Sequence, residues 1–86
     1  MKITGTRSYI DIEQNGKTAR FLGKLCIDGF AAIASTMTWL SPHENNPVTE
    51  SDCISLMKIV TEELKNNKNK IFFTNDRYED IDISSL

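Results

Sequence analysis

The sequence predicts an α+β domain, in which an antiparallel three-strand meander and one further strand pack on a single amphipathic helix in the order β-β-β-α-β. Two dipeptides typical of tight hairpins, Asn15-Gly16 and Asp28-Gly29, divide the first half into three stretches with alternating apolar residues. Residues 48–68 then place apolar side chains at helical spacing, and residues 70–74 form a short apolar run. Because a helix with one apolar stripe needs a second layer against it, we expect the sheet to cover that stripe.

In the meander, the first turn also predicts which residues face each other. A two-residue loop at Asn15-Gly16 places Asp11 opposite Arg20 and Ile10 opposite Phe21, so that opposite charges pair and apolar residues pair. A loop at Asp28-Gly29 likewise places Ile27 opposite Phe30, Cys26 opposite Ala31 and Leu25 opposite Ala32. The two-residue period then predicts one buried face made of Ile10, Ile12, Ala19, Phe21, Leu25, Ile27, Phe30 and Ala32. Gly23 falls inside the long middle strand, where we expect a bulge or a bend.

The helix has a predicted start and a predicted buried side. Thr49 can cap the first free amides, and Asp52 stands where a capping box needs its acidic residue. Charged residues such as Lys58 and Glu62 fall on the outer side. At about 100° per residue, the apolar stripe consists of Cys53, Leu56, Met57, Val60 and Leu64.

The end of the chain predicts one more strand and an acidic tail. Residues 70–74 carry three consecutive apolar side chains, which favours a strand with contacts on both faces and an inner position in the sheet. Residues 75–86 form an acidic C-terminal extension. Ile81 and Ile83 alternate around Asp82, a pattern that fits a half-buried edge strand or a loose acidic tail.

Length and composition bound the domain count and the function. The 86 residues (1–86) make a single domain with one small core, and 40% hydrophobic with 26% charged residues is typical of folded chains. The net charge of −2 argues against a generally basic surface for nucleic acid. There is no apolar run of about 18 residues and no N-terminal charged segment followed by an apolar one. We therefore expect no membrane span and a cytoplasmic location.

The residues that carry chemistry elsewhere form no recognisable motif in this sequence. His43, the only histidine, lies beside Glu44 in a predicted loop, and no phosphate-binding glycine loop or zinc-ligand spacing is present. Cys26 and Cys53 lack the spacing of a disulfide scaffold, so we expect buried free thiols. A Cys26–His43 nucleophile pair stays open, although nothing in the sequence would orient it. We expect no enzyme activity, no cofactor and no metal.

Several short motifs, taken in order, resemble one group of small immunity proteins from bacterial polymorphic toxin systems, which include contact-dependent growth inhibition systems. The resemblance covers about residues 1 to 74 and implies a bacterial, cytoplasmic protein that binds and neutralises a cognate toxin domain without being an enzyme. The motifs are Met1-Lys2-Ile3-Thr4, Asn15-Gly16-Lys17, Gly29-Phe30-Ala31, Trp39 followed by Pro42, Pro47-Val48-Thr49-Glu50 and Lys70-Ile71-Phe72-Phe73.

The predicted toxin contacts are the long irregular loop and the acidic tail. Such loops are where binding residues collect, and concentrated charge guides partner choice. Trp39 has two interpretations, an anchor of the core or an interface residue. The predicted contact residues are Trp39, His43, Glu44, Asp76, Glu79 and Asp80. The rival hypothesis is a regulatory or ligand-binding module without a toxin partner, and the oligomeric state stays open.

Overall fold

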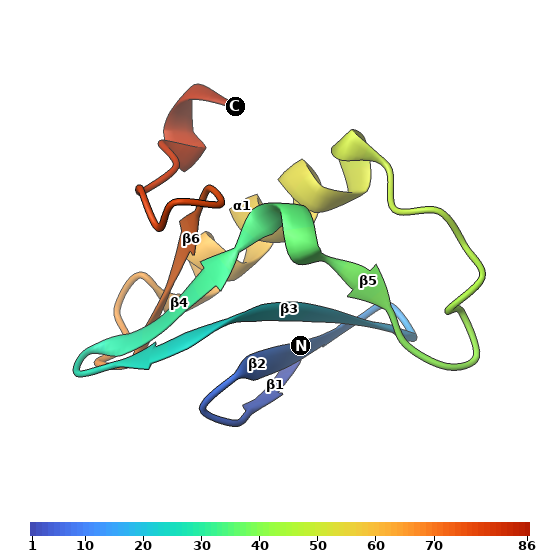
Figure 1. Ribbon diagram of the computed structural model, residues 1–86, viewed down its shortest axis with the longest axis horizontal. Helices are drawn as coiled ribbons and strands as arrows, with labels where there is room; N and C mark the ends of the chain where they lie inside the picture. The colour runs from blue at the N-terminus through green and yellow to red at the C-terminus, as the bar shows by residue number, and fades with distance from the viewer.

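The strands of the computed structural model, which describes residues 1–86, form one six-stranded sheet that folds around a single helix (Figure 1). The spatial order is β1-β2-β3-β4-β6, and β5 pairs with β3 beyond the end of β4. The predicted α+β class, with a meander, one helix and a later strand, is confirmed. The elements are β1 (Lys2–Gly5), β2 (Tyr9–Gln14), β3 (Lys17–Cys26), β4 (Gly29–Ile33), β5 (Thr38–Trp39), α1 (Glu50–Leu64) and β6 (Lys70–Thr74), with short 3₁₀ turns η1 (Ala34–Thr36) and η2 (Ile83–Ser85). β1 and β5 are additions that the sequence pattern did not predict.

The first hairpin has the predicted register. Asp11 pairs with Arg20 and Ile10 pairs with Phe21, and the turn residues Asn15 and Gly16 both have positive φ, at 54° and 80°. Two positive φ values are what a type I′ turn requires, and its twist matches that of the strands it joins.

The second hairpin is shifted by one residue from the prediction. Leu25 pairs with Phe30 and Cys26 pairs with Gly29, so the loop consists of Ile27 and Asp28 rather than Asp28 and Gly29. Leu25 is 60% exposed and Ile27 is 101% exposed, so their predicted places in the core are wrong. The other six residues predicted for that face are buried.

The position of Gly29 explains the shift. Gly29 belongs to β4 and not to the turn, because β6 passes so close to it that no side chain fits there. A Cβ atom added to Gly29 would lie 1.8 Å from the carbonyl oxygen of Lys70 in the adjacent β6. The amide of Lys70 also donates to the carbonyl of Asp28 at 3.1 Å. Only a residue without a side chain allows this close approach of two backbones.

β3 bends at Gly23, as the sequence predicted. The pairing of β3 with β2 ends at Leu22, and its pairing with β4 begins at Gly23. A Cβ atom on Gly23 would lie 1.9 Å from the carbonyl oxygen of Ala31. Where η1 interrupts the sheet, the amide of Leu22 donates to Oγ1 of Thr36 at 2.9 Å, which replaces the missing backbone partner. The bend lets the sheet curve around the core.

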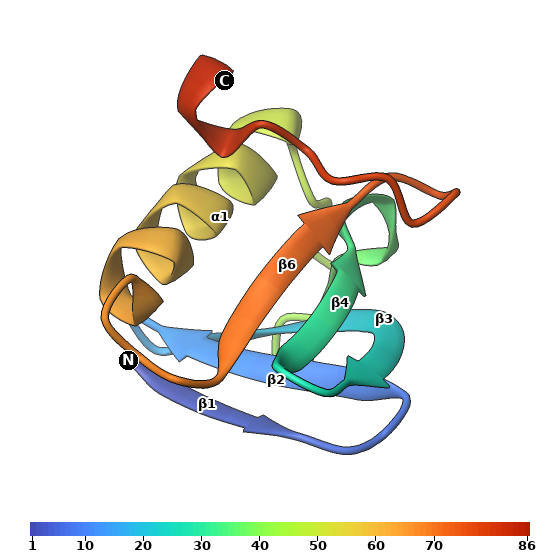
Figure 2. The ribbon, with the colours of Figure 1, turned by 90° about the vertical axis from the view of Figure 1, so that its left-hand side faces the viewer.

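α1 covers the concave side of the bent sheet (Figure 2). The predicted capping box is confirmed, since Thr49 accepts from the Asp52 amide at 3.0 Å and Asp52 accepts from the Thr49 amide at 3.2 Å. On the predicted stripe, Leu56, Met57 and Val60 are buried, and the two end residues pack against the core at its margin. The buried cluster consists of Ile10, Ile12, Ala19, Phe21, Phe30, Ala32, Met37, Leu56, Met57, Val60 and Phe73.

β6 spans the predicted residues, but its predicted inner position is wrong. The connection through α1 returns the chain parallel to β4, so β6 is the last strand of the sheet. The tail folds back along it, with a single bridge between Thr74 and Asp80 and a hydrogen bond from the Ile81 amide to the Phe73 carbonyl at 2.9 Å. The tail is therefore neither a full edge strand nor loose.

Candidate functional site

The six predicted contact residues lie on two separate surfaces. Trp39, His43 and Glu44 belong to β5 and the loop after it, which we call the 39–47 loop. Asp76, Glu79 and Asp80 belong to the turn after β6, which we call the tail turn (residues 75–80). Figure 1 shows the loop on one side of the molecule and the tail on the other. The structure therefore brings each group of three together and does not bring the two groups together.

Trp39 is half-buried and packs against the core cluster, which favours its interpretation as an anchor. The ammonium of Lys17 lies 4.9 Å from the centre of its ring, within the range of a cation–π contact. Its Nε1 atom is buried and has no hydrogen-bond partner. Only part of the ring is thus available to a partner.

The rest of the 39–47 loop is held by short-range backbone hydrogen bonds. The His43 amide donates to the Leu40 carbonyl at 2.9 Å, and the His43 carbonyl accepts from the Asn46 amide at 2.9 Å. His43 is half-buried with Nδ1 enclosed and unpaired, whereas Glu44 is exposed and belongs to no ion pair. Glu44 is therefore the charge that this loop presents to a partner.

The tail turn is built around Asn75. Its Oδ1 accepts from the amides of Arg77 and Glu79 at 2.9 and 3.0 Å, and its Nδ2 donates to Oε1 of Glu79 at 2.8 Å. An asparagine side chain that bonds its own backbone in this way stabilises a turn. The Glu79 carboxylate therefore already accepts a hydrogen bond within the turn, while Asp80 is exposed and belongs to no ion pair.

Two contacts join the tail turn to η1 and to β3. Oγ of Ser35 donates to Oδ1 of Asp76, and the ammonium of Lys24 lies 4.3 Å from the centre of the Tyr78 ring. Both partners belong to segments far from the tail in the sequence. Within the tail turn, the carboxylates of Asp76 and Glu79 are therefore held by hydrogen bonds.

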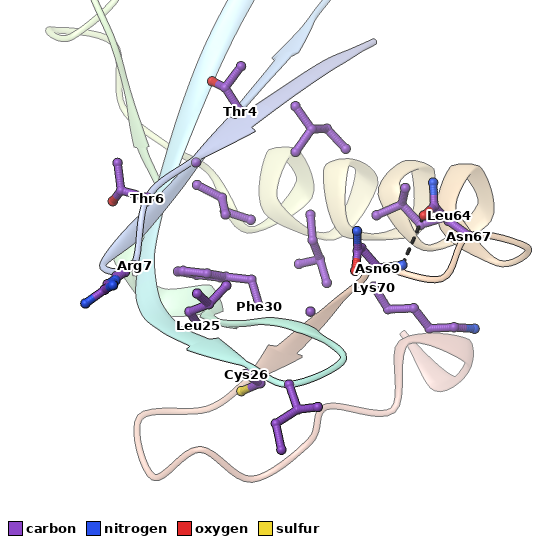
Figure 3. A pocket seen from close by; sticks show the side chains of 16 residues that line it. Thr4, Thr6, Arg7, Leu25, Cys26, Phe30, Leu64, Asn67, Asn69 and Lys70 are labelled. Atoms are coloured by element: carbon purple, nitrogen blue, oxygen red, sulfur yellow. Dashed lines mark hydrogen bonds between the residues drawn. The ribbon is translucent and has the colours of Figure 1, made fainter.

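A third surface was not predicted from the sequence. A groove of about 730 Å³ opens between the turn after β1, the tip of the β3–β4 hairpin and the start of β6 (Figure 3). Its two cations, Arg7 and Lys70, form no ion pair. Ile27 is the sequence feature that could have indicated the groove. It stands directly before Asp28-Gly29, and a shift of that turn by one position exposes its large apolar side chain. The groove is lined by Ile3, Thr4, Gly5, Thr6, Arg7, Ile10, Leu25, Cys26, Ile27, Gly29, Phe30, Leu64, Asn67, Asn69, Lys70 and Ile71.

The cysteines and the histidine do not form a nucleophile pair. Cys26 lies at the end of β3, at the tip of the β3–β4 hairpin. The loop that carries His43 begins at the other end of β3, where the Leu40 amide donates to the Thr18 carbonyl. Burial raises the pKa of Cys53 above its ordinary value, because the thiolate is disfavoured away from water. Both cysteines are free thiols, as predicted, but each is half-buried and not fully buried.

No three side chains among histidine, cysteine, aspartate and glutamate are grouped so that they could hold a metal ion. The single α-helix, α1, is too short and too polar to cross a membrane.

The ionic contacts are the Asp11–Arg20 and Glu62–Lys65 pairs. Neither lies among the residues that line the groove.

Comparison with known proteins supplies the family. No curated protein and no solved structure matches this chain. A family model described as Immunity protein 74 matches residues 2–74, which include all six strands and α1 and leave out the tail. The match agrees with the extent of the resemblance seen in the sequence. The chain therefore belongs to the Immunity protein 74 family, a family of immunity proteins of toxin-immunity systems.

Proposed function

We propose that this protein protects a bacterial cell from a cognate toxin domain by binding that domain in the cytoplasm and neutralising it through protein–protein contact, without catalysing a reaction. The family match over residues 2–74 is the observation that carries the proposal, because it covers the whole sheet and its helix. Immunity proteins act as specific inhibitors, and specific inhibition requires exposed groups with fixed positions. The 39–47 loop and the tail turn both supply such groups.

The contacts proposed from the sequence divide into two hypotheses. In the first, Glu44 and the exposed part of Trp39 contact the toxin, with His43 supporting the loop. In the second, Asp80 and the fixed carboxylates of Asp76 and Glu79 contact it. The tail turn presents several carboxylates and the loop presents that of Glu44, and these groups would suit a basic patch on the toxin, since complementary charge speeds association and selects the partner.

Growth rescue tests the function directly. The toxin domain encoded beside this gene would be produced in cells with and without the protein, and the affinity of the two purified proteins would be measured. We expect rescue and binding. The matched variants Glu44→Lys and Asp80→Lys each change one exposed charge, and Glu63→Lys makes the same change on the exposed side of α1 as a control.

The variant that loses affinity identifies the surface. Trp39→Ala in a folded protein extends the test of the loop to its aromatic residue. Unchanged affinity in Trp39→Ala and Glu44→Lys would remove the 39–47 loop as the site. A wild-type protein that neither binds the toxin nor restores growth would overturn the proposed function.

The alternative is a regulatory or ligand-binding module without a toxin partner. The apolar groove favours it, because small-molecule sites are commonly concave and mostly apolar. The neighbouring gene discriminates: a large secreted protein with a variable C-terminal toxin domain supports immunity, and an operon of metabolic enzymes supports the module.

A further inference from the structure

The groove is an uncovered continuation of the hydrophobic core. Phe30, which is 4% exposed, belongs to both the core cluster and the groove lining. α1 ends at Leu64, and the β3–β4 hairpin continues past it, so that Leu25 is left 60% exposed and Ile27 fully exposed. Apolar side chains that line a concave surface and remain in water are typical of a binding site.

The charged side chains that line the groove have one sign, and the nearest acidic residue along the chain is the exposed Asp28 between the lining residues Ile27 and Gly29. Its 16 lining residues include Arg7 and Lys70 and no aspartate or glutamate, although the whole chain has more acidic than basic residues. The Lys70 ammonium donates to the backbone carbonyl of Lys65 at 3.3 Å, which leaves its positive charge without a carboxylate. In Figure 3, Arg7 and Lys70 lie on opposite sides of Leu25 and Phe30. The groove thus has an apolar centre and a basic rim.

We propose that this groove docks an acidic, apolar-rich segment of the toxin domain. The inference rests on the proposed function, which supplies the toxin as partner. An apolar side chain of the segment covers Leu25 and Ile27 beside Phe30, and a neighbouring carboxylate pairs with Arg7 or Lys70. A basic segment would place like charges together at the rim, which weakens association. The arrangement of an apolar centre inside a charged rim is that of ordinary protein interfaces.

The first arm of the test measures the affinity of groove variants for the toxin domain encoded beside this gene. Ile27→Asp and the double variant Arg7→Glu with Lys70→Glu place negative charge at the groove. Ile27→Lys removes the same apolar side chain with the opposite charge, and Lys68→Glu reverses an exposed charge outside the lining. We expect about tenfold or greater weakening for Ile27→Asp and for the double variant, as for centrally placed interface residues. A smaller loss is expected for Ile27→Lys and no change for Lys68→Glu.

The second arm uses defined probes in place of the toxin. Two synthetic peptides of equal length, one alternating leucine with glutamate and one alternating leucine with lysine, are titrated into the ¹⁵N-labelled protein. We expect the glutamate peptide to shift the amide signals of Leu25, Ile27 and Lys70, and the lysine peptide to leave them in place. Thermal unfolding of each variant confirms that the fold is retained.

The outcomes separate the two proposals. If wild-type protein binds the toxin and the groove variants bind equally well, the groove inference fails while the immunity function stands. If wild-type protein does not bind the toxin, the proposed function fails. In the peptide titrations, equal amide shifts with both peptides, or no amide shifts, overturn the groove's preference for acidic ligands. A dimer that dissociates on dilution and is lost in Ile27→Asp would identify a second copy as the occupant and overturn the toxin segment.

Discussion

Leu25 and Phe30 face each other across β3 and β4, yet Leu25 is 60% exposed and Phe30 is 4% exposed. The two side chains share one face of the sheet, and both line the groove. Phe30 is also covered by the core, whereas Leu25 lies beyond it. The edge of the hydrophobic core therefore falls between two directly paired residues, and the uncovered one faces the groove.

This boundary predicts unequal costs for two truncations. Phe30→Ala should lower the free energy of unfolding by about 3–5 kcal/mol, because it leaves a cavity in the core. Leu25→Ala should change it by no more than about 0.5 kcal/mol, as expected for an exposed side chain. Urea unfolding of both variants checks the difference. Equal costs would show that Leu25 is covered in solution.

The capping box at the start of α1 should contribute measurably to stability. Thr49→Ala removes the acceptor for the Asp52 amide and should cost about 0.5–2 kcal/mol. Thr49→Ser keeps a hydroxyl at the same place and should recover most of that loss. Chemical denaturation followed by circular dichroism measures both, and a serine variant as unstable as the alanine variant would contradict the capping explanation.

Two glycines should respond to alanine for different reasons. At Gly16, φ is +80° with open space around it, so alanine should cost about 1–2 kcal/mol from the backbone conformation alone. At Gly23, the new Cβ would meet the Ala31 carbonyl oxygen at 1.9 Å, so backbone must move and the cost should exceed about 3 kcal/mol. Thermal unfolding ranks the two variants. A milder effect at Gly23 than at Gly16 would mean that the β3 bend relaxes easily.

The pKa of Cys53 predicts how stability depends on alkaline pH. Burial raises this pKa in the folded state above its ordinary value of 9.0, so the unfolded chain loses the thiol proton first. The stabilising contribution is fully present below pH 9.0 and is lost as the pH rises through the folded-state pKa. Cys53→Ala should therefore flatten part of the decline measured by urea unfolding between about pH 8 and pH 11. A Cys53→Ala variant whose decline equals that of the wild type would contradict this contribution.

The tail should protect the edge of β6. Deleting residues 75–86 removes the Ile81 hydrogen bond to Phe73 and the contact of Ile83 with the core. We expect lower thermal stability and concentration-dependent association, because an open strand edge pairs with other chains. Light scattering after size-exclusion chromatography measures the mass. A truncated protein that stays monomeric and equally stable would show that the tail has no such role.

The candidate surfaces divide into two that the sequence predicted and one that it did not. The 39–47 loop and the acidic tail are recognisable from turn-forming residues and charge, and the structure fixes where they lie. The groove was not predicted, because it requires three segments to meet: the turn after β1, the β3–β4 hairpin and the start of β6. Its apolar residues carry the same pattern as core residues, and only the end of α1 at Leu64 leaves them uncovered.

The sequence by itself determined the first hairpin, the helix and its cap, and the bounds of β6, because each depends on residues within a few positions of one another. The tertiary structure alone decided the second turn and the edge position of β6. Gly29 is adjacent to Lys70 only after α1 has carried the chain back beside β4. The close approach of these two backbones, far apart along the chain, excludes any side chain at position 29, overrides the local preference of Asp-Gly for a turn and places Ile27 in the solvent.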